Sequence, residues 1–156
     1  MTDIIIQGIY GRMGRTLLEK IAARTDCRVV AGVDCKDGQV GEIPVFDSFE
    51  KLPCGGVLID FSSPAGAVAA AAYGAAKQLP CVICSTGLAP GQEDALRAAS
   101  TKTPVFRSAN MSLGINVLIE LAKQATRTLG TEFDIEINEK HHHNNLAAPS
   151  GTALMI

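Results

Sequence analysis

The sequence predicts an α/β fold in which a Rossmann-type parallel sheet carries helices on both faces. Short runs of valine, isoleucine and leucine alternate with helical patterns along residues 1–129. Such uninterrupted apolar strands are typical of a parallel sheet buried between two helix layers. A glycine-rich turn also joins the first strand to the first helix. We therefore expect residues 1–129 to form one domain built on this sheet.

The expected elements follow one another through short connections. Apolar strands or strand-like segments are expected at 4–6, 28–33, 43–46, 56–61, 81–84 and 105–106, helices at 12–23, 64–77, 92–99 and 112–129, and a polar loop at 37–42. The helix that begins at Pro64 has the clearest start, because Ser63 offers a polar cap and proline fits the first helical turn.

The pattern changes near Gly130. Residues 133–141 alternate apolar and charged side chains, which is the period of a half-exposed strand, and Ser150 would cap a further helix. We therefore expect residues 130–156 to begin a second, α+β domain. A segment of about 27 residues is too short to bury its own core. The chain is accordingly expected to be a fragment of a longer protein.

Composition argues against several functional classes. The net charge is -2, aromatic residues make up 4% of the chain and tryptophan is absent, so no surface for nucleic acid or anionic lipid is indicated. The chain opens without a basic signal-peptide region and has no apolar run of the roughly 20 residues that span a membrane. We expect a cytosolic protein.

The five cysteines fit a reducing compartment better than a disulfide framework, because their number is odd. Cys81 and Cys84 form a CxxC pattern, which could be a redox or metal pair. The other interpretation is two small apolar side chains on a buried strand. Residues three apart on a strand point to opposite faces, which favours this second interpretation.

The turn after the first strand carries three glycines whose spacing suits a dinucleotide. Gly8 permits a tight turn, Gly11 lets the backbone approach a pyrophosphate, and Gly14 lets the helix pack closely on the strand. The helix N-terminus adds free N–H groups and partial positive charge. Asp34 ends the second strand, where a carboxylate would bind the adenosine ribose. We predict a nicotinamide dinucleotide site, the alternative being a turn that only connects two elements.

Lys36 leaves the choice of coenzyme open. Its ammonium group could neutralise a 2′-phosphate, which would suit NADPH, or it could simply be solvated. The sequence therefore predicts NADH or NADPH without deciding between them. The bulky ring of Tyr10 within the turn has no clear role at this stage.

Several motifs together resemble those of one family. They are Gly8–Gly14, Asp60–Pro64, Ser85–Gly87, Ser108–Asn116, Glu139–His142 and Ala148–Ala153. In this order they resemble the 4-hydroxy-tetrahydrodipicolinate reductase (dihydrodipicolinate reductase) family, along essentially the whole chain. The resemblance implies an NADH- or NADPH-dependent reductase of lysine and diaminopimelate biosynthesis that acts on a small dicarboxylate. It also implies a Rossmann domain followed by a substrate domain that builds a homotetramer.

The resemblance also implies roles for individual residues. The pyrophosphate and ribose would be held by Gly8, Ile9, Tyr10, Gly11, Arg12, Met13 and Asp34, and the nicotinamide end would be lined by Cys84, Ser85, Thr86, Ser108, Ala109, Asn110 and Met111. His141 corresponds to the catalytic histidine and His142 to a substrate contact. Ser150, Gly151 and Thr152 correspond to the segment that binds a substrate carboxylate. A helix start of this kind suits an anion on its own physics, although an ordinary helix cap would look the same.

Two positions depart from the family pattern. Asn145 stands where the family has a lysine that donates a proton, and Ala147 stands where it has an aspartate. Asparagine cannot donate a proton at neutral pH, and a positioned acid contributes about 10²–10⁴-fold in rate. Two interpretations therefore stay open: an impaired reductase, with His141 as a partial substitute, or a module that binds the dinucleotide without turnover. A third, weaker alternative is a Rossmann reductase for another small acid.

The run of three histidines at 141–143 could also suggest a metal site. Neighbours on a strand alternate faces, so at most His141 and His143 would point the same way. No cysteine or acidic residue lies nearby in a known ligand spacing. We expect no metal.

Overall fold

The chain forms two compact units, Met1–Ser108 and Ala109–Ile156. The computed structural model describes residues 1–53, 55–141 and 148–156. The division falls before the long helix α4 (Leu113–Leu129), whereas the sequence placed the boundary near Gly130, after that helix. Among the described residues, no helix has the length and apolar character needed to cross a membrane.

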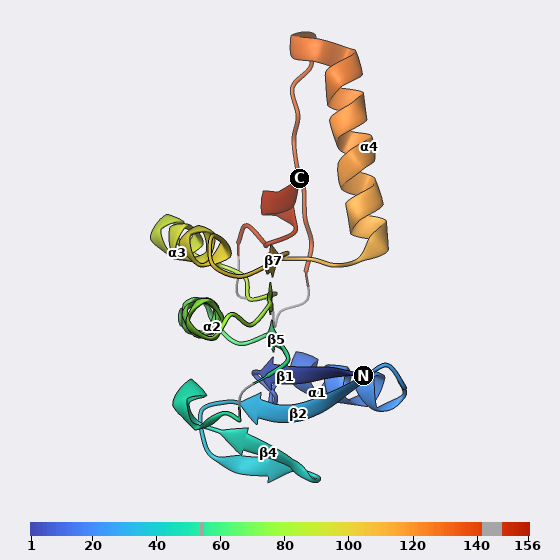
Figure 1. Ribbon diagram of the computed structural model, residues 1–156. Coiled ribbons are helices and arrows are strands. Elements are labelled where there is room, and N and C mark those ends of the chain that lie inside the picture. The colour runs from blue at the N-terminus through green and yellow to red at the C-terminus, as the bar shows by residue number, and fades with distance from the viewer. Residues whose placement is uncertain (54, 142–147) are drawn as a thin grey trace. The chain divides into compact units, whose positions relative to one another are not determined.

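The first unit is built on a seven-stranded sheet (Figure 1). Its strands are β1 (Thr2–Gln7), β2 (Cys27–Val33), β3 (Gly38–Val40), β4 (Ile43–Phe46), β5 (Val57–Asp60), β6 (Cys81–Ile83) and β7 (Val105–Arg107). The spatial order is β3-β4-β2-β1-β5-β6-β7, and every neighbouring pair is parallel except β3 and β4. The predicted Rossmann-type sheet is confirmed. From β1 the chain builds the sheet first toward β2 and β4 and then, beginning with β5, toward the other edge. Such sheets bind ligands at this change of strand order, between β1 and β5.

Strand β3 was not expected, because residues 37–42 were predicted to be a polar loop. Gly38 pairs with Val45 and Val40 pairs with Ile43, so β3 and β4 form an antiparallel hairpin at the sheet edge. Gly41 turns the hairpin with a φ of +61°, a conformation that glycine adopts without strain. Edge strands commonly carry polar side chains, and for this reason the polar residues of β3 were interpreted as a loop.

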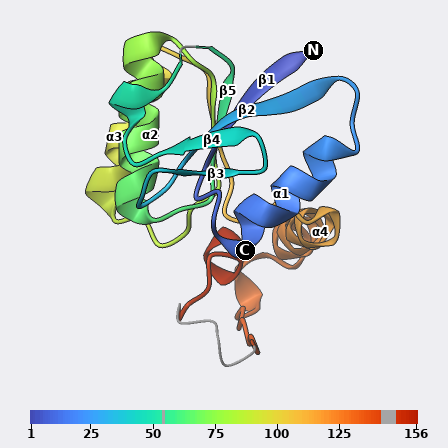
Figure 2. The same ribbon diagram turned by 90° about the horizontal axis from the view of Figure 1, so that it is seen from below.

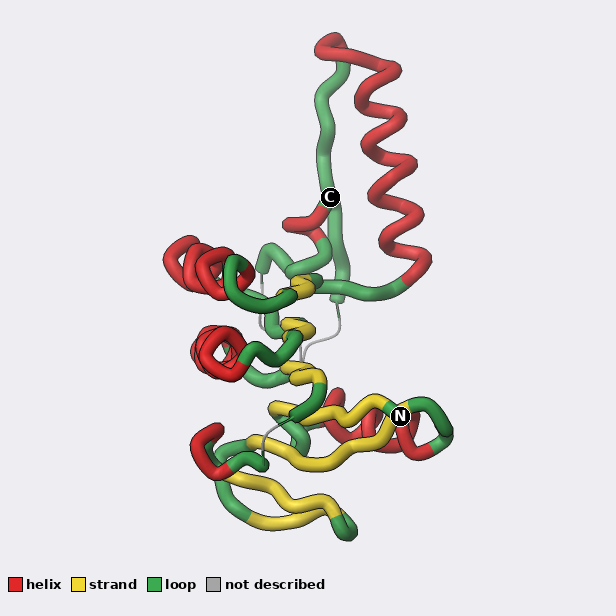
Figure 3. The backbone as a smooth tube through the Cα atoms, in the orientation of Figure 1, coloured by secondary structure: helices red, strands yellow, loops and turns green. Residues whose placement is uncertain are grey.

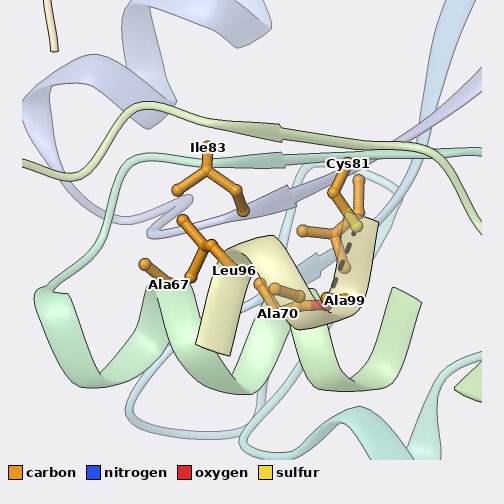
Figure 4. Packing of buried hydrophobic residues seen from close by; sticks show 8 residues of the cluster. Ala67, Ala70, Cys81, Ile83, Leu96 and Ala99 are labelled. Carbon is orange, nitrogen blue, oxygen red and sulfur yellow. Dashed lines mark hydrogen bonds between the residues drawn. The ribbon is translucent and has the colours of Figure 1, made fainter. Parts of the chain in front are cut away.

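Helices cover both faces of the sheet, as predicted. Helix α1 (Arg12–Ala22) lies on one face, and α2 (Pro64–Lys77) and α3 (Pro90–Ser100) lie on the other (Figure 2). The alanines of α2 bring it close to the sheet, and the cluster of Ala67, Ala70, Cys81, Ile83, Leu96 and Ala99 is buried between them (Figure 4). At its start, Ser63 accepts a hydrogen bond from the Gly66 N–H (3.1 Å), which confirms the predicted cap.

In the described residues of the second unit, the helical elements are α4 and two short 3₁₀ turns, η2 (Gly130–Glu132) and η3 (Ala153–Met155) (Figure 3). The strand expected at 133–141 is not formed, so that prediction was wrong. A strand needs a hydrogen-bonded neighbour, and the described residues of this unit contain none. Its apolar side chains stay exposed, with Phe133 at 58% and Ile135 at 65%. The helix expected after Ser150 is only the turn η3.

Candidate functional site

A cleft of about 590 Å³ opens at the carboxyl ends of β1, β2 and β5. One group of lining residues follows β1 and β2: Gln7, Gly8, Gly11, Val33, Asp34 and Cys35. The other walls are Asp47, Ser48, Phe49 and Glu50 after β4, and Phe61, Ser62, Ser63, Gly66 and Ala69 after β5. All of these residues belong to the unit Met1–Ser108.

Gly8 and Gly14 have the local structural roles that the sequence predicted. Gly8 has a φ of +79°, and a Cβ there would lie 2.4 Å from the Phe61 carbonyl oxygen. At Gly14 a Cβ would lie 2.6 Å from the Cα of Ile9, because α1 packs directly on the turn. Gly11 differs: its φ is -71°, and a Cβ would meet only the Gly8 carbonyl oxygen, at 3.1 Å. Gly11 therefore keeps open a space in the cleft beside the start of α1.

Asp34 is held at the cleft by two backbone amides. Its Oδ2 accepts from the Tyr10 N–H and its Oδ1 from the Cys35 N–H, both at 2.8 Å. The first bond joins the glycine turn to the end of β2. Two charge-assisted hydrogen bonds fix the carboxylate in one orientation, which suits recognition of ribose hydroxyls.

Tyr10 lies beside this cleft without closing it. Its ring packs against the cluster behind β1 and β2, and a Cβ at Gly38 would lie 2.4 Å from its hydroxyl oxygen. The Lys36 ammonium lies 5.9 Å from the centre of the ring, within reach of a cation–π interaction. The bulky ring thus supports the lysine and the β3 edge, and it is not among the residues that line the cleft.

The other residues of the turn contribute mainly through the backbone. Ile9 is fully buried in the core beside Gly32. Arg12 and Met13 open α1 and are exposed. Their position at the helix start fits an anion-binding role for the N–H groups there.

The charge of the cleft is negative. Three carboxylates line it, those of Asp34, Asp47 and Glu50, and no lysine, arginine or histidine lines it among the described residues. The nearby Lys51 binds Asp37 at 2.6 Å and Asp47 at 2.9 Å.

A buried polar network ties the ends of β5 and β6 together. Asp60 is completely buried, and its Oδ1 accepts hydrogen bonds from the N–H and the hydroxyl of Ser62. The Ser62 N–H also reaches the hydroxyl oxygen of Ser85, at 3.0 Å. The start of α2 places its positive dipole end near this carboxylate. The network positions the loop after β5, which lines the cleft, against the loop after β6.

Residues predicted at the nicotinamide end follow β6 and β7. Cys84 and Ser85 are buried, and Thr86 is exposed. The Ser108 N–H donates to the Ile83 carbonyl oxygen (3.1 Å), which fixes the end of β7 beside β6. Ala109, Asn110 and Met111 begin the second unit.

The CxxC pattern is structural. Cys81 packs in the core under α2, where its Sγ lies 3.8 Å from the Ala70 carbonyl oxygen (Figure 4). Burial, with a smaller contribution from the charge of Asp60, raises the pKa of both Cys81 and Cys84 to about 11. Such thiols stay protonated at neutral pH and are poor nucleophiles.

The second unit brings together part of the predicted substrate site. Glu139 Oε1 accepts from the Ser150 N–H at 2.9 Å, and its Oε2 lies 3.4 Å from His141 Nδ1. The Ser150 hydroxyl oxygen accepts from the Ala153 N–H at 3.1 Å, which caps η3. Asn110 donates to the Thr152 hydroxyl at 2.8 Å. Gly151 lies between these two contacts and is half-buried.

His142, Asn145 and Ala147 lie outside the described residues. Within the ranges 1–53, 55–141 and 148–156, no group of three histidine, cysteine or acidic side chains is placed to hold a metal ion.

The sequence pattern assigned no role to two parts of the cleft, Gln7 and the wall formed by Asp47 and Glu50. In the second unit it assigned none to Glu139. The signal for the wall was its place directly after β4, since carboxyl ends of parallel strands share one edge.

Comparison with known proteins points to one family. Family models described as "Dihydrodipicolinate reductase, N-terminus" and "Dihydrodipicolinate reductase, C-terminus" match residues 2–111 and 114–156. Curated relatives called 4-hydroxy-tetrahydrodipicolinate reductase include proteins of Caldanaerobacter subterraneus subsp. tengcongensis, 43% identical, and Clostridium tetani, 38% identical. Each alignment covers 100% of this chain and 62% of the relative, so the chain spans about 62% of their length.

Solved structures agree with this assignment. A dipicolinate-bound dihydrodipicolinate reductase from Paenisporosarcina sp. TG-14 is 26% identical, with a TM-score of 0.75 over 99% of this chain and 63% of that one. An aspartate dehydrogenase from Thermotoga maritima, 16% identical with a TM-score of 0.60, covers 79% of this chain and 52% of its own. The second likeness concerns the fold alone.

Proposed function

The chain belongs to the dihydrodipicolinate reductase family, and on that premise we propose that it carries the coenzyme site and part of the substrate site of an NAD(P)H-dependent reductase. The substrate is 4-hydroxy-tetrahydrodipicolinate, and the reaction belongs to lysine and diaminopimelate biosynthesis. The observation that carries the proposal is the cleft in which Gly8 and Gly11 face the fixed carboxylate of Asp34. The bound dinucleotide would supply the hydride for the reduction.

We propose further that the coenzyme is NADH rather than NADPH. The carboxylates of Asp34, Asp47 and Glu50 line the cleft, and Asp34 is the proposed partner of the adenosine ribose, which carries the 2′-phosphate in NADPH. Lys36 lies over the Tyr10 ring, and Lys51 is paired with two aspartates. Because Lys51 compensates Asp47, the carboxylates of Asp34 and Glu50 would provide the repulsion of the phosphate, while Asp34 would accept hydrogen bonds from the ribose hydroxyls.

Calorimetric titration of the chain with each coenzyme tests both proposals. We expect NADH to bind at least tenfold more tightly than NADPH. Asp34→Ala should weaken NADH about tenfold or more, since hydrogen bonds to charged groups contribute about 1.5–3 kcal/mol. Asp34→Ala should also reduce the difference in affinity between NADH and NADPH, because it removes the repulsion between the Asp34 carboxylate and the 2′-phosphate.

Glu42→Ala is the matched control, because Glu42 is an exposed acid on the β3–β4 hairpin that does not line the cleft. It should leave both affinities within about twofold. Equal affinities for the two coenzymes would contradict the NADH preference. Absence of binding to both would contradict the dinucleotide site itself.

At the substrate end we propose His141 as the proton-transferring side chain, with His142, Ser150, Gly151 and Thr152 as substrate contacts. Support comes from the Ser150 and Thr152 contacts, which order the start of η3. Backbone N–H groups and hydroxyls at such a turn suit a carboxylate of a dicarboxylate substrate. We retain a homotetramer and a cytosolic location as further proposals for the whole protein.

We propose that Asn145 and Ala147 lower turnover, because Asn145 cannot supply the proton that the family lysine donates. Asn145→Lys, in a chain completed with a family C-terminal part, should raise the rate of NADH oxidation about 10²-fold or more. The rate is followed at 340 nm with the cyclic imine substrate. If the completed wild-type chain already turns over as fast as the variant, Asn145 is not a defect.

The second candidate is a dinucleotide-binding module without turnover, which Asn145 itself favours. In that case NADH would bind with the affinity and Asp34 dependence described above. Neither the completed chain nor its Asn145→Lys variant would then oxidise NADH.

A further inference from the structure

One carboxylate in the second unit joins two residues of the proposed substrate site. Glu139 uses Oε1 to accept the Ser150 N–H at 2.9 Å and presents Oε2 to His141 Nδ1 at 3.4 Å. Ser150 is 11 positions further along the chain, so this bond closes a loop between the histidine segment and the start of η3. Nothing in the sequence analysis gave Glu139 a role of its own.

The surroundings of Glu139 keep it charged. Hydrogen bonds from the hydroxyl and the N–H of Ser150 hold the pKa of Glu139 below its usual value, and His141 acts in the same direction. Oε2 is inaccessible to solvent and makes no hydrogen bond to the described residues, so its 3.4 Å approach to His141 Nδ1 is an ion-pair contact. A charged oxygen that is shielded from water stabilises a proton on the imidazole nitrogen that faces it.

This pairing decides which nitrogen of His141 can exchange protons. When Nδ1 carries the proton toward Glu139, Nε2 is left with its lone pair or, in the cation, with the transferable proton. In many sites where an imidazole transfers protons, a neighbouring carboxylate fixes the tautomer of the histidine in this way. Because the same carboxylate also holds the Ser150 amide, the imidazole and the proposed carboxylate-binding turn are oriented together.

We propose that Glu139 is a positioning residue of the reaction, which holds His141 in the Nδ1–H form and couples it to the substrate-binding turn at Ser150. The inference rests on the proposed function for its catalytic meaning. Its structural content, the tautomer of His141 and the hydrogen bond to Ser150, does not depend on turnover.

The test is ¹⁵N NMR of the 156-residue chain labelled in histidine and in backbone amides. The chain has three histidines, so His141→Asn identifies the signals of that ring. At a pH where the ring is neutral, the wild-type chain should show His141 mainly as the Nδ1–H tautomer. Glu139→Gln should shift the population toward the Nε2–H form and move the Ser150 amide resonance upfield as its charge-assisted bond is lost.

Glu136→Gln is the matched control, because Glu136 is an exposed carboxylate on the same extended segment. It should leave both the tautomer and the Ser150 resonance unchanged. A wild-type ring found mainly as the Nε2–H form would overturn the proposal without any variant. A tautomer that is unaltered in Glu139→Gln would overturn it as well.

The outcome separates this inference from the proposed function. If His141→Asn leaves the activity of the completed enzyme intact, His141 is not the proton-transferring group, whatever its tautomer. If His141→Asn abolishes turnover but the tautomer of His141 does not depend on Glu139, the proposed function stands and the proposed role of Glu139 is wrong.

Discussion

At the scale of single residues, the three glycines of the turn after β1 differ in what an added methyl group would meet. At Gly14 the methyl group would meet backbone atoms of the turn at 2.6 Å or less, whereas at Gly11 it would meet only one carbonyl oxygen, at 3.1 Å. Gly14 is therefore needed for folding, whereas Gly11 lies where a pyrophosphate would come close to the backbone.

We therefore expect Gly14→Ala and Gly11→Ala to fail in different ways. Gly14→Ala should destabilise the unit by about 1–3 kcal/mol, since backbone atoms must move, and lower the melting temperature by several degrees. Gly11→Ala should leave the melting temperature nearly unchanged and weaken NADH about tenfold or more. Thermal unfolding and calorimetry on both variants check this, and a Gly11→Ala variant that binds normally would place the pyrophosphate elsewhere.

Residues that act through their backbone or their charge were predictable one at a time. The glycine spacing and the acid that ends the second strand indicated Gly8, Gly11 and Asp34, all of which line the cleft, because each meets a local requirement of a turn or a strand end. Tyr10 was not predictable, since its place depends on Lys36 and Gly38, which reach it only after the β3–β4 hairpin forms. Glu139 was missed because its role depends on Ser150, a contact that forms only in the folded chain. Gln7 was missed because the cleft that it lines forms only when separate strand ends meet.

At the scale of elements, the loops after β5 and β6 are joined through buried side chains. Ser85 is 5% exposed and accepts the Ser62 N–H, while Asp60 accepts the same group and the Ser62 hydroxyl. The shared donor links two loops at the carboxyl edge of the sheet. Shifting one loop therefore shifts the wall of the cleft.

Ser85→Ala should cost about 1 kcal/mol of unfolding free energy, the usual contribution of one hydrogen bond, and lower the melting temperature by about 2–4 °C. Ser100→Ala removes a hydroxyl that donates to the Arg97 carbonyl oxygen at the exposed end of α3. This control should change stability by no more than about 0.5 kcal/mol. Equal effects in thermal unfolding of the two variants would contradict a special role for the buried network.

Periodicity identified elements that complete their hydrogen bonds locally or within the sheet. The expected bounds of α2 were correct to the residue, because Ser63 and Pro64 mark its start chemically. The alternation of apolar and charged residues at 133–141 led to the wrong prediction of a strand. Such alternation indicates which side chains could be buried, but not whether a neighbouring strand exists. The β3–β4 hairpin was missed because its edge position permits polar residues.

At the scale of the whole molecule, the chain combines a mostly parallel sheet with a short second unit. The unit Met1–Ser108 contains all seven strands and the entire lining of the cleft. The unit Ala109–Ile156 leaves apolar side chains such as Leu113 and Ile135 largely exposed. The chain spans about 62% of the length of its curated relatives. Coenzyme binding is therefore the part of the proposed function that can be tested on this chain alone.

The most direct measurement is a map of backbone amide shifts on addition of NADH to the ¹⁵N-labelled chain. The account predicts that the largest changes fall on the glycine turn from Gly8 to Gly14, on Cys35 beside Asp34, and on Phe61 and Ser62. The remote face of α3 should stay unchanged. Large shifts confined to other parts of the chain, with the glycine turn unaffected at saturating NADH, would contradict it.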